Sequence, residues 1–362
     1  MMKAVPSLEK IAVLLSRCGY IQNDLGKAVY TCGPAGTLLR HNIHHTWWDK
    51  MVNRSEASFP VSGENISLLK DFYMPTLRLM NHSVPFSLTH ISQSSPVQPV
   101  QGHEHIAALL NLHSETRMEL VHFCSQTAVN QTFDVVVNSR ISWWKQYSCN
   151  YANFTQKTEG EGGLQEVHLQ YTSPWGPVTI ETVKNRGQDE VSRLAEEIGQ
   201  DCKVKNGKKM AIPYMIESVT SLELATALFL IDAFTERSSV NDNTVTRQVL
   251  QLHPALAPYK VCMCQDGSLT RQIQEVVTYV SRELRKAGLH VLDTRRDSGD
   301  VDAQIHRNDE FGVPFTVTVN NNTIKTGNIQ LRNRDTSIQV PRWTSCLGSS
   351  SMICELCSSR LI

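Results

Sequence analysis

The residues in this sequence best suited to chemistry are its histidines and cysteines, and their spacing argues against a metal site. Three histidines share one stretch with helical periodicity: His41, His44 and His45. No acidic partner follows them, so we expect them on the protein surface. His103-Glu104-His105 lacks the spacing that places two histidines on one face of a helix. Cys354 and Cys357 form a single CxxC pair, whereas a zinc site would need a second pair nearby. We therefore expect no metal and no cofactor.

A cluster of lysines on a polar loop around Gly207 is the strongest basic patch in the chain. Its members are Lys203, Lys205, Lys208 and Lys209. Most clusters of this kind are simply solvated. Because Lys+Arg and Asp+Glu balance at 35 each, any contact with nucleic acid depends on such a local patch. The candidates for DNA binding are Lys205, Lys208, Lys209, Arg295 and Arg296.

Length and composition indicate an ordinary globular protein. A chain of 362 residues with 41% hydrophobic residues is long enough for one large and one small domain. The longest apolar stretch, Leu224–Phe234, contains Asp232 and is too short to cross a membrane. Ten cysteines without regular spacing favour isolated thiols in a reducing compartment.

In the first half of the chain, the sequence predicts helices before and after a loop-rich stretch. Leu8–Cys18 forms an amphipathic helix ended by Gly19, and its basic residues are also compatible with a weak mitochondrial presequence. Prolines punctuate residues 56–102, which we expect to be a mobile insertion. Leucine spacing predicts a helix over Ile106–Cys124, and Val135–Val137 could be a strand.

In the second half of the chain, the sequence predicts alternating strands and helices. Val167–Tyr171 and Val178–Val183 form a hairpin, and Trp143-Trp144 is more typical of buried core than of base stacking. Beyond residue 260 the pattern predicts a strand at Val261, an amphipathic helix ended by Gly288, and strands at 289–292 and 314–319 separated by a polar loop. An alternating segment, Ile329–Thr336, completes a small α/β domain.

Three blocks of this C-terminal region resemble the anticodon-binding domain of glycyl-type class II aminoacyl-tRNA synthetases. They are His253–Lys260, Asn308–Phe315 and Leu331–Asp335. Tyr30–Ile43, followed by Trp47-Trp48, resembles the motif 1 region of the same enzymes, where the helix lies at a dimer interface. The resemblance implies an α+β class II synthetase-like core, with helices on an antiparallel sheet, followed by an α/β anticodon-binding-like domain. We expect boundaries of 1–245, 246–340 and an atypical tail at 341–362.

The segment Ala211–Ala225 is similar to motif 3 of class II synthetases, but with changed chemistry. Ser221 and Glu223 stand where that motif has glycines, and Leu224 stands at the position of its phosphate-binding arginine. A leucine cannot hydrogen-bond phosphate, and a glutamate repels it. Arg117-Met118-Glu119 has the letters of motif 2, but it falls in the expected helix and is interpreted as a coincidence. We therefore expect no catalytic residue and no adenylation activity.

A synthetase-like scaffold without its chemistry resembles the family of accessory subunits of mitochondrial DNA polymerase gamma, in their shorter invertebrate form. The resemblance implies a non-catalytic protein of the mitochondrial matrix and nucleoid that binds the catalytic polymerase subunit and DNA and raises processivity, without a membrane contact. For the polymerase contact we expect Val261, Val277, Val280, Phe315, Gly327, Arg332 and Arg334.

Two other interpretations remain open from the sequence. One is an active glycyl-like synthetase, and the other is a free-standing tRNA-binding paralogue. The tail Val340–Cys346, followed by Gly348–Ser351, suits neither the strand nor the helix with which the family usually continues. A monomer is favoured over the dimer of vertebrate relatives, because residues 56–102 show no counterpart of their helical insertion.

Overall fold

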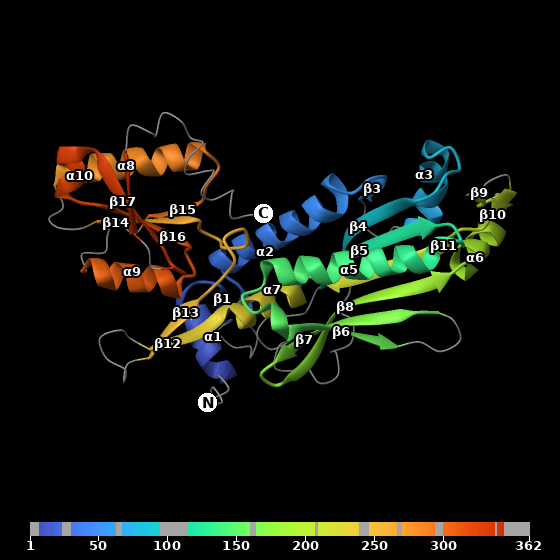
Figure 1. Ribbon diagram of the computed structural model, residues 1–362, viewed down its shortest axis with the longest axis horizontal. Helices are drawn as coiled ribbons and strands as arrows, with labels where there is room; N and C mark the ends of the chain where they lie inside the picture. The colour runs from blue at the N-terminus through green and yellow to red at the C-terminus, as the bar shows by residue number, and fades with distance from the viewer. Residues whose placement is uncertain are drawn as a thin grey trace.

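The protein consists of a large body built on a seven-stranded sheet and a small body built on a five-stranded sheet (Figure 1). The computed structural model describes residues 7–23, 30–62, 67–94, 115–159, 164–206, 209–238, 246–265, 270–293, 300–336 and 339–343. Within these ranges no helix is long and apolar enough to cross a membrane.

The large sheet has the strand order β3-β4-β5-β11-β8-β7-β6 and is antiparallel except for the β3–β4 pair. Its strands are β3 (Ser58–Val61), β4 (Phe86–Ser94), β5 (Glu115–Cys124), β6 (Phe154–Glu159), β7 (Glu166–Ser173), β8 (Gly176–Gly187) and β11 (Tyr214–Ser221). The short hairpin of β9 (Val204–Asn206) and β10 (Lys209–Ala211) lies at one end of this body (Figure 1).

Two hydrophobic cores cover the two faces of the large sheet. The larger core contains side chains of α1 (Leu8–Arg17), α2 (Pro34–Trp48), α5 (Val129–Tyr147) and α7 (Leu222–Ala233). The opposite core contains side chains of the π-helical turn η2 (Leu68–Tyr73), α3 (Met74–Leu79) and α6 (Asp189–Ile198). Because α7 lies inside the larger core, nearly all its side chains are buried, which matches its uniformly apolar sequence.

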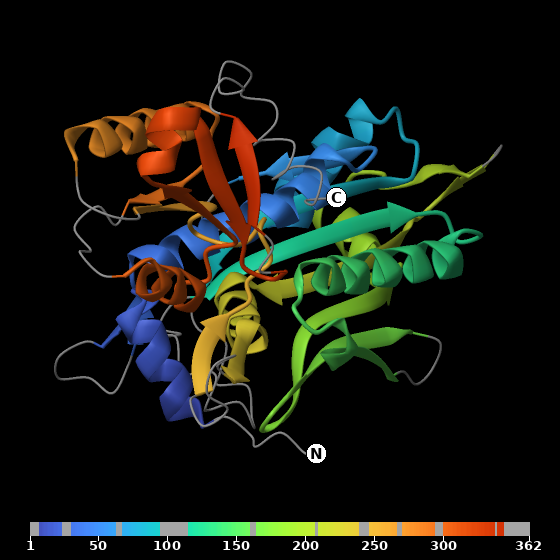
Figure 2. The same cartoon turned by 60° about the vertical axis from the view of Figure 1, so that its left-hand side comes forward.

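The small body is an α/β domain with strand order β15-β14-β16-β17-β18. Its elements are β14 (Val261–Gln265), α8 (Arg271–Lys286), β15 (Val291–Asp293), α9 (Val301–Glu310), β16 (Phe315–Val319), α10 (Asn321–Thr326), β17 (Asn328–Asn333) and β18 (Gln339–Trp343). The first three strands in this order are parallel and the last two pair antiparallel. Helices α8 and α9 lie on opposite sides of the sheet (Figure 2).

Several elements expected from the sequence are confirmed. Helix α1 is followed by Gly19 in the left-handed conformation, and α8 by Gly288 in the same conformation. Strands β7 and β8 form the expected hairpin. The motif 3 segment is a strand followed by a helix, although the helix begins at Leu222, four residues before Thr226. The Trp143-Trp144 pair is buried, as expected.

Other expectations were wrong. Glu115–Cys124, expected in a helix, is strand β5, and the earlier part of that predicted helix lies outside the described residues. Strand β5 alternates partly exposed and buried residues from Glu115 to Leu120, but Leu120 and Val121 are both buried, which interrupts the alternation of a half-buried strand. Val135–Val137 belongs to helix α5, and the expected loop-rich insertion contains β3, η2, α3 and β4. The polar loop before β16 contains helix α9.

The expected boundary at residue 245 does not separate the two bodies. Strand β12 (Phe234–Ser238) pairs antiparallel with β13 (Thr246–Leu250), so this hairpin spans the boundary. The larger core continues to Ala257, and the core of the small domain begins at Val261. In the tail, β18 adds a strand beside β17, contrary to the expectation that this composition forms no strand. Residues 344–362 lie outside the described part of the chain.

Candidate functional site

The junction of β11 and α7 carries Ser221, Glu223 and Leu224, the positions at which the sequence predicts a changed motif 3. The Ser221 hydroxyl caps the helix by accepting a hydrogen bond from the Leu224 backbone N–H at 3.3 Å. Glu223, in the first turn of α7, is only 5% exposed. Leu224 is half-buried and packs against the larger core. This corner is therefore closed by protein side chains.

The Glu223 carboxylate joins three segments that are distant in sequence. It accepts hydrogen bonds from the Thr116 backbone N–H at 2.7 Å and from the Thr116 hydroxyl at 2.9 Å, both at the start of β5. It also forms an ion pair with Arg40 of α2. Because the carboxylate already neutralises the Arg40 cation, that cation is not free to attract a phosphate group. We call this group of three residues the Glu223 network.

A cavity of about 590 Å³ lies on the opposite face of the same sheet, and its lining includes two arginines and three glutamates, all of them in ion pairs. Arg117 of β5 contacts Glu119 at 3.3 Å and Glu217 at 3.2 Å, and Arg186 of β8 contacts Glu217 at 2.6 Å. The run Arg117-Met118-Glu119 therefore lies on a strand that pairs antiparallel with β4, the arrangement that motif 2 requires. The expectation that it belongs to a helix was wrong, and so was the reason for treating it as a coincidence.

Burial changes the pKa of one carboxyl group in this cavity. Loss of solvent raises the pKa of Glu119 to about 7, and the nearby Glu217 carboxylate adds to the rise, while Arg117 opposes it. The arginines are already paired with these carboxylates, so the cavity has no unpaired cation among its described charged residues that could stabilise a phosphate.

The structure separates the residues predicted to bind DNA. Lys205 on β9 and Lys209 on β10 are exposed, but the hairpin register places their side chains on opposite faces of the two-stranded ribbon. Lys203 pairs with Asp201. Lys208, Arg295 and Arg296 lie outside the described residues.

The residues predicted to contact the polymerase lie in the core of the small domain or in its internal contacts. Val261, Val277, Val280 and Phe315 form the core of the small domain, with at most 6% of each side chain exposed. Arg332 forms a bidentate ion pair with Asp309, at 2.8 and 2.9 Å. Gly327 ends α10 in the left-handed conformation. The apolar pattern that identified these positions is the pattern of a domain core, and their contact with the polymerase stays a prediction.

Arg334 connects the small domain to the larger core. Its guanidinium, 1% exposed, donates hydrogen bonds to the carbonyls of Leu250 at 3.0 Å, Gly312 at 2.8 Å and Leu252 at 2.8 Å. Leu250 and Leu252 belong to the larger core, whereas Arg334 follows β17. This side chain therefore fixes the two bodies relative to each other instead of facing a partner.

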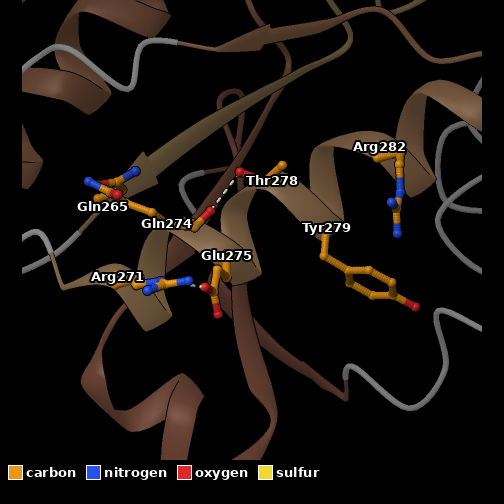
Figure 3. A pocket seen from close by; sticks show the side chains of 7 residues that line it. All are labelled: Gln265, Arg271, Gln274, Glu275, Thr278, Tyr279 and Arg282. Atoms are coloured by element: carbon orange, nitrogen blue, oxygen red, sulfur yellow. Dashed lines mark hydrogen bonds and ion pairs between the residues drawn. The ribbon is translucent and has the colours of Figure 1, made fainter.

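Sequence reasoning missed a polar groove on the exposed side of α8 (Figure 3). It has a volume of about 560 Å³ and is lined by Gln265, Arg271, Gln274, Glu275, Thr278, Tyr279 and Arg282. Arg271 pairs with Glu275 at 3.0 Å, and the Arg282 guanidinium lies 5.6 Å from the centre of the Tyr279 ring. The signal was present in the sequence, because the helical residues follow i, i+3, i+4 spacing opposite the apolar face. We call them, with Gln265, the α8 groove.

The fold defines the class of the protein. A solved structure of prolyl-tRNA synthetase from Cryptosporidium parvum, complexed with L-proline and AMP, matches 98% of this chain and 76% of that chain with a TM-score of 0.65 at 13% identity. The halofuginone and AMPPNP complex from the same organism gives a TM-score of 0.67 at 12% identity, over 100% of this chain and 79% of that one. The family model "Anticodon binding domain" matches residues 260–342. The chain has a class II aminoacyl-tRNA-synthetase-like fold with a C-terminal anticodon-binding domain.

Curated proteins with a similar sequence are of two kinds, DNA polymerase gamma-2 subunits and glycine–tRNA ligases. The chain is 29% identical over 275 residues to "DNA polymerase subunit gamma-2, mitochondrial" of Xenopus laevis, covering 74% of this chain but only 58% of the frog protein. It is 27% identical over 369 residues to "DNA polymerase subunit gamma-2" of Mus musculus, covering 85% of this chain and 79% of the mouse protein. It is also 27% identical over 274 residues to "Glycine--tRNA ligase" of Geobacillus kaustophilus, covering 73% of this chain and 56% of that enzyme.

Proposed function

We propose that this protein is a non-catalytic accessory subunit of mitochondrial DNA polymerase gamma. In this role it binds the catalytic subunit, strengthens the grip of the complex on primer-template DNA and acts in the mitochondrial matrix. The observation that carries the proposal is the similarity to DNA polymerase subunit gamma-2 of three vertebrates, at 26–29% identity over 74% or more of the chain.

The physical basis of this role is avidity. A polymerase that holds DNA through its own surface and through a bound subunit dissociates more slowly, because both contacts must open together. No chemical step is required of the accessory subunit. A rigid two-body scaffold, with the bodies joined through Arg334, suits a protein that must present two surfaces at a fixed distance.

The Glu223 network supports the non-catalytic part of the proposal. An adenylating enzyme of this class needs a positive charge at the ATP phosphates, and removing one charge-stabilising group commonly costs about a hundredfold or more in rate. Here the corresponding corner contains a buried carboxylate and Leu224. The Glu223–Arg40 pair also joins the elements on which such a site would be assembled.

The exposed residues of the α8 groove are the best candidates for the polymerase contact. They lie on the outer face of the helix whose inner face carries the buried Val277 and Val280. Tyr279 is 44% exposed, and tyrosine and arginine are the side chains that most often carry binding energy at interfaces. The two described lysines of the β9–β10 hairpin, Lys205 and Lys209, are the candidates for DNA.

Sedimentation of the purified chain with the catalytic polymerase subunit of the same organism tests the proposal. We expect a defined complex, and the same runs measure whether the free protein is a monomer. The double variant Tyr279→Ala and Arg282→Glu should weaken the complex by about tenfold or more, because it removes an aromatic anchor and reverses a charge. Lys157→Glu, on the distant edge strand β6, is the matched control. Absence of any complex with the unaltered chain would refute the proposal.

A second candidate function is that of a glycine–tRNA ligase or a tRNA-binding paralogue. It is favoured by the 26–27% identity to bacterial glycine–tRNA ligases and by the position of Arg117 and Glu119 on a motif 2-like strand. Glycine-dependent exchange of pyrophosphate into ATP would support the ligase. Binding of tRNA without exchange, together with no polymerase complex, would support the paralogue.

A further inference from the structure

The turn Cys18–Tyr20, which follows α1, lies between a helix of the large body and a helix of the small domain. Cys18 is 2% exposed and Tyr20 is fully buried. Helix α2 begins on one side of the turn, and α9 ends on the other. Because a helix leaves its first N–H groups and its last carbonyl groups without partners inside the helix, both ends need partners from elsewhere. The turn supplies some of them at each end.

The backbone of the turn is fixed to the beginning of α2. The Gly33 N–H donates to the Tyr20 carbonyl at 2.9 Å, and the Ala35 N–H donates to the Gly19 carbonyl at 3.0 Å. The two segments lie so close together that a Cβ atom on Gly36 would overlap the Tyr20 carbonyl oxygen. The close approach of the two backbones therefore requires a glycine in the first turn of α2.

The side chains of the turn reach the end of α9. The Tyr20 hydroxyl donates to the Phe311 carbonyl at 2.9 Å, and the Cys18 thiol donates to the Glu310 carbonyl at 3.5 Å. Burial raises the pKa of Cys18 to about 12 and also raises the pKa of Tyr20, so both groups keep their protons and remain donors. Arg334 donates to the next carbonyl along the chain at 2.8 Å. Three successive carbonyls at the end of α9 therefore receive donors from outside the helix.

Helix α1 anchors this turn in the larger core. Its residues Ile11, Leu14 and Leu15 are at most 1% exposed and belong to that core. In Figures 1 and 2 the blue N-terminal segment passes the end of α9. Removal of α1 would leave an apolar gap in the core and free the turn that follows it. A presequence, by contrast, is removed from the finished protein, and the fold must be complete without it.

We propose that the segment Leu8–Tyr20 is a permanent brace between the two bodies, and that it stays in the mature protein instead of being removed as a presequence. The brace positions α9, and with it the small domain. Its basic residues Lys10 and Arg17 are exposed, as on the outer face of any amphipathic surface helix. Only the import experiment below rests on the mitochondrial location in the proposed function.

Hydrogen exchange followed by mass spectrometry tests the brace in the purified protein. Tyr20→Phe removes one hydroxyl and leaves the Phe311 carbonyl without this donor. The amides of residues 311–313 should then exchange about tenfold faster, because a buried acceptor has lost its partner, while exchange in β6 and β7 stays unchanged. Tyr151→Phe is the matched control, because Tyr151 is 70% exposed, and it should change neither region.

Two results of the exchange experiment would refute the brace. One is unchanged exchange of residues 311–313 in Tyr20→Phe. The other is an equal acceleration over the whole chain, because a residue that only adds to overall stability would affect all regions alike.

Import of the full chain into mitochondria isolated from the same organism tests whether the segment is retained. Trypsin cleaves after Lys10 and Arg17, and the resulting peptide Ile11–Arg17 should be recovered from the imported protein in the same ratio to peptides of the small domain as before import. Loss of this peptide on import, with a new N-terminus after Arg17, would overturn the inference. If the chain is not imported, the mitochondrial part of the proposed function fails, and the exchange experiment decides on the brace.

Discussion

Replacing Glu223 by alanine should destabilise the large body, because the carboxylate has three partners and little solvent. The substitution leaves the Thr116 backbone N–H without its acceptor and Arg40 without its counter-ion. Glutamine in the same place keeps an acceptor oxygen and removes the charge. The two variants therefore separate the hydrogen bonds of Glu223 from its charge.

The expected loss of stability in Glu223→Ala depends on how far Glu223 and Arg40 are buried. Removing one member of a buried ion pair costs about 3–5 kcal/mol. The Arg40 side chain is 30% exposed and can recover part of its hydration, which places the expected loss for Glu223→Ala near the lower end, at about 3 kcal/mol. For a body of this size that corresponds to a fall in Tm of about 6 °C or more. Glu223→Gln should lose less, because the amide oxygen can still accept one of the two Thr116 hydrogen bonds.

Urea unfolding followed by intrinsic tryptophan fluorescence measures this loss. Glu236→Gln is the matched control, because Glu236 forms an exposed pair with Lys10 whose removal should cost less than ~1 kcal/mol. In a double-mutant cycle, Arg40→Met and Glu223→Ala together should cost less than the sum of the two single changes. If Glu223→Ala loses no more than the control, the carboxylate does not hold the three elements together and the reasoning is refuted.

Three further predictions concern ionisation, the connection between the bodies and the partner surface. The raised pKa of Glu119 means that the folded state holds this proton more tightly than the unfolded state, so the stabilisation is complete below the ordinary value of 4.5 and is lost as pH rises through about 7. Urea titrations at about pH 5 and about pH 8.5 should show a fall in stability for the unaltered protein that Glu119→Gln reduces, and an equal fall in both would contradict this. Arg334→Met should cost about 3 kcal/mol or more and speed proteolysis between the bodies, because three buried carbonyls lose their donor, while unchanged proteolysis would show that other contacts suffice. Val277→Asp should unfold the small domain, whereas Tyr279→Ala should leave its melting unchanged and weaken only polymerase binding, measured by calorimetry and sedimentation.

Elements with strong periodicity could be predicted from the sequence. Helix α8 carries apolar residues at helical spacing and ends before Gly288, and both features survive in the fold. The β7–β8 hairpin alternates and turns at Gly176. Strand β5 was missed because its alternation of partly exposed and buried residues, regular from Glu115 to Leu120, is interrupted at Val121.

The candidate site was predictable only in part. The positions of Ser221, Glu223 and Leu224 could be inferred from resemblance, but the partners of Glu223 could not. Arg40 and Thr116 are 183 and 107 residues away in sequence, and no local pattern connects them. Apolar periodicity in α8 identifies residues that hold the small domain together, and it carries no information on the polar face of the same helix, where we propose the polymerase contact.

The most direct measurement of the central claim is the length of DNA made in one binding event. The catalytic polymerase subunit is allowed to extend a labelled primer, with excess heparin added at the start to capture any polymerase that dissociates. Adding this protein should lengthen the products about tenfold or more if a second contact slows dissociation, and the Tyr279→Ala, Arg282→Glu variant should lose most of that gain. Products of unchanged length with the unaltered chain, at concentrations that saturate the complex, would contradict the account.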